Sequence, residues 1–96
     1  MIDNSKGDLD NPLKYLQEAL KIDQEIGYKQ GEAKVLDNIG LILKSKGDLE
    51  NALKYLKDAI NIMDKYKFIH GRNVIQKAIN SITNDLERKL TKKPKK

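Results

Sequence analysis

The residues that could perform catalysis are few and do not form a constellation of known chemistry. His70 is the only histidine of the 96 residues and cysteine is absent, which leaves no thiolate nucleophile and no sulfur-ligated metal site. Asp48 and Glu50 form a close carboxylate pair, but they stand at a predicted helix start, where capping and the helix dipole favour acidic residues. Gly40 lies inside a helical pattern and not in a phosphate-binding loop. We therefore expect a non-catalytic protein without a metal or cofactor.

The positive charge of the chain is concentrated at its C-terminal end. The net charge is +5, and four lysines of the final segment TKKPKK account for all but one of these charges. A basic binding face should be clustered on a folded surface, and the remainder of the chain shows no such cluster. We interpret residues 91–96 as a disordered, lysine-rich tail. The alternative is that this tail binds nucleic acid or another acidic surface, although we do not expect nucleic acid as the main partner.

The overall composition is polar but globular, with 39% hydrophobic and 34% charged residues and a mean hydropathy of −0.68. No apolar run approaches the roughly 20 residues that a membrane-spanning helix requires. The start of the chain lacks the basic, then apolar, then small-residue pattern of a secretion signal. We expect a soluble protein of the cytoplasm that makes no membrane contact.

The apolar residues that must position any binding site follow helical spacing throughout. They recur in steps of three and four residues, and no alternating pattern typical of strands competes with this. Gly47 and Asp48 fit a helix end followed by the cap of the next helix. Asn11 and Pro12 fit a cap followed by a first helical position. The sequence predicts an all-α fold of about four antiparallel helices, at 11–26, 31–46, 48–66 and 70–90.

Two stretches of the chain are near-copies of each other. Residues 6–22, KGDLDNPLKYLQEALKI, and residues 46–62, KGDLENALKYLKDAINI, are identical at 11 of 17 positions with an offset of 40 residues. The copies differ at Pro12, which replaces the small residue Ala52. A helical hairpin that repeats at this length is typical of solenoids, in which stacked neighbours bury one continuous core.

The hairpin resembles a tetratricopeptide repeat, in a long variant of 40 residues. The residues that carry the resemblance lie in LDNIGLIL and GDLENALKYLKDAI, and they are Leu36, Ile39, Gly40, Leu43, Ala52, Leu56 and Ala59. The aromatic positions of the family are aliphatic here, and Asp64 stands where the family has its proline. Each repeat consists of two helices, which we call its first-type and its second-type helix in chain order. The resemblance implies one domain, 1–90. In it, a second-type helix with its linker (7–31) precedes a complete repeat (33–72) and a terminal first-type helix (71–90).

The resemblance also implies a function in protein–protein interaction, as a scaffold or adaptor. Repeats of this family bind a protein or peptide in a concave groove that the first-type helices line. The face that would line it carries Lys34, Asp37, Asn38, Leu41, Ser45, Lys77, Ser81 and Asp85. Asn38 stands where many family members hold the backbone of the ligand. The alternative is that the polar residues form a solvated face and that Leu41 packs against a neighbouring loop.

Both ends of the repeat array are incomplete. A first-type helix is missing before residues 11–26 and a second-type helix is missing after residues 71–90, and a repeat buries its apolar face only against neighbours. We therefore predict self-association, with a dimer favoured, in which residues 71–90 of one molecule dock on residues 11–26 of the next. The expected contact residues are Leu16, Ala19, Ile82, Leu86 and Leu90. The alternative is a longer array whose flanking helices cover these faces.

Overall fold

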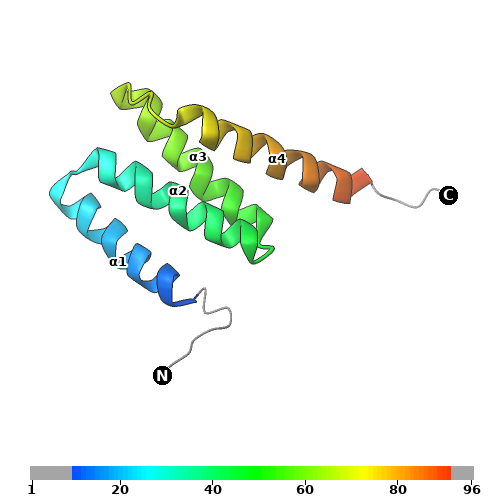
Figure 1. The fold of residues 1–96 in the computed structure, drawn as a ribbon, viewed down its shortest axis with the longest axis horizontal. Coiled ribbons are helices and arrows are strands. Elements are labelled where there is room, and N and C mark those ends of the chain that lie inside the picture. The colour runs from blue at the N-terminus through cyan, green and yellow to red at the C-terminus, as the bar shows by residue number, and fades with distance from the viewer. Residues whose placement is uncertain (1–9, 92–96) are drawn as a thin grey trace.

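Four α-helices make up almost all of the chain that the structure describes. The computed structural model describes residues 10–91, and the side-chain surroundings of residues 11–89. The helices are α1 (Asp10–Ile26), α2 (Lys29–Ser45), α3 (Leu49–Tyr66) and α4 (Arg72–Thr91), and residues 10–91 contain no strand. The chain reverses direction at each corner, and α1 and α4 lie on opposite sides of the α2–α3 hairpin (Figure 1). The predicted all-α fold is confirmed.

All four helices start within two residues of the predicted positions: α3 and α4 begin one and two residues late, at Leu49 and Arg72, and α1 and α2 begin early. α1 begins one residue early, so that Asn11 and Pro12 lie within its first turn and not at its boundary. A proline is tolerated there because the first N–H groups of a helix have no helical partner. α2 begins two residues early, so that Gly31 belongs to the helix and not to the linker. Glycine suits this position because a Cβ would lie only 2.5 Å from the Tyr28 ring.

The turn between α2 and α3 follows the prediction. Gly47 has a φ of +88°, and the Asp48 N–H after it donates a hydrogen bond of 2.9 Å to the Leu43 carbonyl. Asp48 then caps α3, since its Oδ1 accepts a hydrogen bond of 3.4 Å from the Asn51 N–H. This turn sets the register in which α3 lies against α2.

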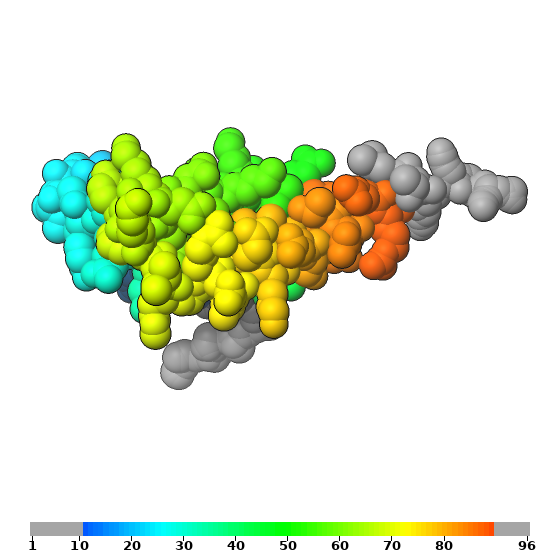
Figure 2. Space-filling view, turned by 90° about the horizontal axis from the view of Figure 1, so that it is seen from above, coloured from blue at the N-terminus to red at the C-terminus, as the bar shows by residue number. Residues whose placement is uncertain are grey.

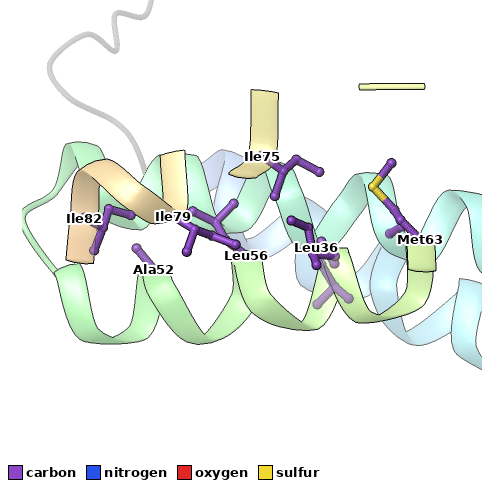
Figure 3. Close-up of a cluster of buried hydrophobic side chains, with 10 residues drawn as sticks. Leu36, Ala52, Leu56, Met63, Ile75, Ile79 and Ile82 are labelled. Atoms are coloured by element: carbon purple, nitrogen blue, oxygen red, sulfur yellow. The ribbon is translucent and has the colours of Figure 1, made fainter. Parts of the chain in front are cut away.

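The core lies where α3 packs between α2 and α4. Leu56 of α3 is fully buried, in one cluster with Leu36 of α2 and Ile79 of α4 (Figure 3). Gly40 permits this close approach, because a Cβ there would lie 2.6 Å from Leu56 Cγ and 3.2 Å from the Ala52 carbonyl oxygen. Gly40 and Ala52, two small residues of the repeat pattern, therefore lie at a close contact between α2 and α3.

One polar contact is repeated at both corners where a second-type helix meets the next first-type helix. At the α1–α2 corner, Gln24 Nε2 donates to Glu32 Oε2 over 3.2 Å. At the residues 40 positions later, Arg72 donates to Asp64 through Nε (2.6 Å) and through a terminal nitrogen (3.0 Å). These hydrogen bonds lower the pKa of Asp64. The position at which the family has its proline is therefore occupied by an ion pair that ties the end of α3 to the start of α4.

The α3–α4 corner is nevertheless wider than the α1–α2 corner. Both helices end in a left-handed residue, Gly27 with a φ of +75° and Lys67 with a φ of +61°. The first corner returns to helix at Lys29, whereas its counterpart Ile69 lies outside helix because α4 starts only at residue 72. Ile69 is 81% exposed as a result. Figure 2 looks onto α4, in yellow to orange, with this corner in yellow-green beside its first turns.

Candidate functional site

A groove lies between the first half of α2 and the first turn of α4, and the α3–α4 corner forms one of its walls. Its volume is about 570 Å³. We call it the α2–α4 groove, and it is lined by Gln30, Ala33, Lys34, Asp37, Met63, Lys67, Phe68, Ile69, His70, Gly71, Val74 and Ile75. It lies on the first-type helices, the side of the repeat on which the family resemblance implies a binding surface.

The apolar part of the groove combines buried and exposed side chains. Met63 and Ile75 belong to the buried core, and Phe68 packs against it. Ile69 and Val74, by contrast, are 81% and 64% exposed. Covering exposed aliphatic surface releases about 25 cal/mol for each Å² removed from water. This part of the groove can therefore bind an apolar side chain.

Asp37 is the polar group of the groove whose hydrogen bonding is incomplete. Its Oδ1 is buried, and no donor among the described residues reaches it. Burial raises the pKa of Asp37, and the positive charge of Lys34, one turn earlier on α2, lowers it by less. A buried acceptor without a donor costs about 1–3 kcal/mol. A ligand N–H group that reached this carboxylate would supply the missing hydrogen bond.

The structure brings two of the eight predicted groove residues, Lys34 and Asp37, into the α2–α4 groove. The other six do not line it, and they are Asn38, Leu41, Ser45, Lys77, Ser81 and Asp85. All of these are exposed except Asp85, which is half-buried and pairs with Arg88 over 3.7 Å. Leu41 is 38% exposed, so no neighbouring loop covers it fully.

Phe68 and Ile69 line the groove but were missed in the sequence. They lie in a corner, and a search for helical stripes passes over residues outside helices. The segment YKFIHG nevertheless contains an indication of them, since two consecutive large apolar residues occur there between two predicted helices. Apolar residues in a corner either pack against the core, as Phe68 does, or remain at the surface, as Ile69 does.

The residues expected at a self-association contact lie in unequal surroundings. Leu16 and Ala19 of α1 are partly exposed, whereas Ile82 is fully buried and Leu86 packs against the core of its own chain. The side chain of Leu90 lies outside the described residues. The apolar side of α4 is thus already covered by α3, and we correct the expectation that it docks on α1 of another molecule.

The other side of α4 gives a second reason for this correction. On α2, the residues that face α3 include the apolar Ala33 and Leu36 and the small Gly40. The residues 40 positions later on α4 are polar: Asn73, Gln76 and Asn80. Gln76 Nε2 donates a hydrogen bond of 3.1 Å to Asn80 Oδ1, so that two of these polar side chains bond to each other. These three polar residues offer no apolar stripe on which a helix of a second molecule could dock.

Other kinds of site have no counterpart in the described part of the chain. From residue 11 to residue 89, no three His, Asp or Glu side chains lie together in a way that could hold a metal ion. None of the four helices, over their described lengths, is long and apolar enough to cross a membrane. Of the lysine-rich segment, residues 92–96 lie outside the described residues, so its proposed contact with acidic surfaces stays a prediction.

Comparisons with known proteins agree with this architecture. The sequence profile described as tetratricopeptide repeat matches residues 1–65. A designed protein, DA05, whose structure was determined in solution by NMR, matches with a TM-score of 0.78 and 21% sequence identity. The match covers 94% of this chain and 90% of that chain, and at this identity it concerns the fold alone. The search of curated proteins finds no match.

Proposed function

The chain belongs to the tetratricopeptide repeat family, whose members are protein-interaction repeats, and we propose that it binds a segment of a partner protein in the α2–α4 groove. The observation that supports this site is the buried Oδ1 of Asp37, which has no donor among the described residues, beside the exposed side chains of Ile69 and Val74. A ligand that covers this surface can be stabilised in two ways, by a hydrogen bond to the free acceptor and by the burial of exposed aliphatic side chains.

The proposed ligand carries an apolar side chain next to an N–H donor. The apolar side chain rests against Ile69 and Val74 over the floor formed by Met63, and burying it contributes about 1.5–3 kcal/mol. The donor, from the backbone or from a side chain, binds the Asp37 carboxylate, and a hydrogen bond to a charged group contributes about 1.5–3 kcal/mol. Since association itself costs at least about 4 kcal/mol, these two contacts alone support only weak binding.

Stronger binding requires a longer ligand. The exposed residues Asn38 and Leu41 continue along α2 beyond Asp37, at steps of one turn from Lys34. A segment that ran along α2 would reach the Asn38 amide, which can donate and accept hydrogen bonds at once, and would cover part of Leu41. In this proposal the predicted groove residues of α2 extend the site and do not form its floor.

The experiment selects ligands from a library of random peptides displayed on phage, with the full chain immobilised as bait. Peptides that bind are then measured against Val74→Glu and Asp37→Asn variants. We expect Val74→Glu to abolish binding and Asp37→Asn to weaken it severalfold. Binding to the parent should also fall as the pH is lowered through the raised pKa of Asp37, because protonation removes an acceptor lone pair and its charge.

The control variant is Ile22→Glu, which places a charge at a similarly exposed aliphatic residue on α1 and should leave peptide binding unchanged. Peptides that bind the parent and Val74→Glu equally well would contradict the proposed site. Binding that is lost on deletion of residues 92–96, and that falls steeply with salt, would favour the alternative of a basic tail on an acidic surface.

A further inference from the structure

α1 carries an apolar stripe that no described helix covers. The stripe consists of Pro12, Tyr15, Ala19, Ile22 and Ile26, which follow one another in steps of three, four, three and four residues. Such steps place side chains in a single line along a helix. Tyr15, Ile22 and Ile26 are 73%, 55% and 69% exposed. The α1 stripe is therefore a continuous apolar surface on the outer side of the first helix.

The equivalent positions of α3 show how residues of such a stripe are buried when another helix packs on them. Ala52 and Ala59, 40 residues after Pro12 and Ala19, have no exposed surface. The helix that covers them is α2, whose Gly40 would bring a Cβ to 3.2 Å from the Ala52 carbonyl oxygen. α2 runs antiparallel to α3 in this hairpin (Figure 1). The α1 stripe is thus shaped to accept an antiparallel helix that brings a small residue to the crossing point.

The charges beside the α1 stripe indicate which helix this is. Four exposed residues follow one flank of the stripe with alternating sign: Lys14, Glu18, Lys21 and Glu25. If a second α1 lies antiparallel with Ala19 against Ala19, Lys14 comes opposite Glu25 and Glu18 opposite Lys21, each within one residue, or about 1.5 Å, of register. A parallel arrangement would instead turn this charged flank toward the other flank of the partner helix, which carries Leu13, Leu16 and Leu20 and no complementary series of charges.

We propose that two copies of this chain pair through the α1 stripe, α1 against α1, about a two-fold axis near Ala19. The same register brings Tyr15 of each chain over Ile22 of the other. The contact is isologous, so that it closes at two copies and leaves no stripe open for further addition. The polar side of α4, at the opposite end of the molecule, offers no second surface of this kind among the described residues. No residue of α1 lines the α2–α4 groove, so the groove remains open in both copies.

The first experiment is sedimentation of the full chain at rising concentration. We expect a monomer–dimer equilibrium, and we expect Ile22→Glu to raise its dissociation constant at least tenfold. The matched control is Val74→Glu, which makes the same change at a similarly exposed aliphatic residue of α4 and should leave dissociation unchanged. A parent that remains monomeric at millimolar concentration overturns the proposal, as does dimerisation that Val74→Glu weakens and Ile22→Glu does not.

Two further variants test the antiparallel register. Glu18→Lys should weaken the dimer because it places a lysine opposite Lys21, and adding Lys21→Glu should restore the parent value because the pair is then reversed. Since the chain has no cysteine, Ala19→Cys gives a single thiol near the proposed axis, and mild oxidation should convert the dimer into a disulfide-linked pair. Ser81→Cys on α4 is the control and should stay monomeric under reducing gel conditions and non-reducing ones alike. Failure of Ala19→Cys to cross-link, in a chain that dimerises, overturns the two-fold arrangement.

Discussion

Gly40 tests most directly how α2 and α3 are packed. A Cβ at this position would lie 2.6 Å from Leu56 Cγ, 2.8 Å from Leu56 Cδ2 and 3.2 Å from the Ala52 carbonyl oxygen. Carbon atoms in contact are normally about 3.5–4.0 Å apart. Leu56 is fully buried and the Ala52 carbonyl oxygen belongs to the backbone of α3, so neither can give way unless α3 moves.

The magnitude follows from two opposing terms. Overpacking a filled contact costs roughly 1–3 kcal/mol, and replacing glycine by alanine inside a helix returns about 1 kcal/mol. Gly40→Ala should therefore lower the free energy of unfolding by about 1 kcal/mol, which for a chain of this size lowers the melting temperature by about 4–8 °C. Gly40→Leu forces three more carbon atoms into the same contact, and we expect a larger loss that leaves little folded protein at 25 °C.

The assay is thermal and urea unfolding followed by circular dichroism, in a double-mutant cycle with Leu56→Ala. That substitution alone should cost about 2–5 kcal/mol because it leaves a cavity. In its background, Gly40→Ala should lose most of its penalty, because the two Leu56 atoms that its Cβ would meet are gone and only the Ala52 carbonyl oxygen, at 3.2 Å, remains. A Gly40→Ala chain that melts at or above the parent temperature, or effects of the two substitutions that simply add, would show that the assigned register of α2 on α3 is wrong.

Three further outcomes concern a corner and two carboxylates. Lys67→Gly should stabilise the chain by roughly 0.5–1 kcal/mol, since Lys67 has a φ of +61°, whereas Lys67→Ala should give no gain in the same denaturation assay. Asp64→Asn should destabilise the chain at pH 7, because hydrogen bonds from Arg72 stabilise the charged Asp64 and lower its pKa. This stabilisation is fully present above the pKa of an unfolded Asp, about 3.9, and is lost as the pH falls through the lower pKa of the folded state. Asp37→Asn should stabilise the chain at pH 7, because burial raises the Asp37 pKa and penalises the charged form, which is populated only above that pKa. Melting temperatures from pH 2 to 8 should show the effects of the two substitutions with opposite sign, and both effects should vanish at the acid end.

The sequence by itself determined the helices and the register of the hairpin. Helical spacing and turn residues depend on neighbours within a few positions, so the order of residues along the chain is enough to assign Gly47 and Asp48 to the α2–α3 turn. Gly40 and Leu56 could be assigned to one contact because the repeat pattern relates residues on two helices at a fixed offset. The same local rules missed the true start of α2, because the contact of Gly31 with the Tyr28 ring depends on how the corner folds back.

Only the tertiary structure decided which surfaces remain free. Lys34 and Asp37 were expected in a groove together with six other residues, but the wide α3–α4 corner places the groove at one end of α2 and adds Ile69 to it. From its spacing in the sequence, Ile82 was expected to belong to an apolar stripe that no helix covers, but it is fully buried in the folded chain. The burial of a side chain and the pKa of Asp37 depend on which atoms of other helices lie within a few ångströms. Those distances are set by how the helices pack, and the periodicity of residues along one helix does not predict them.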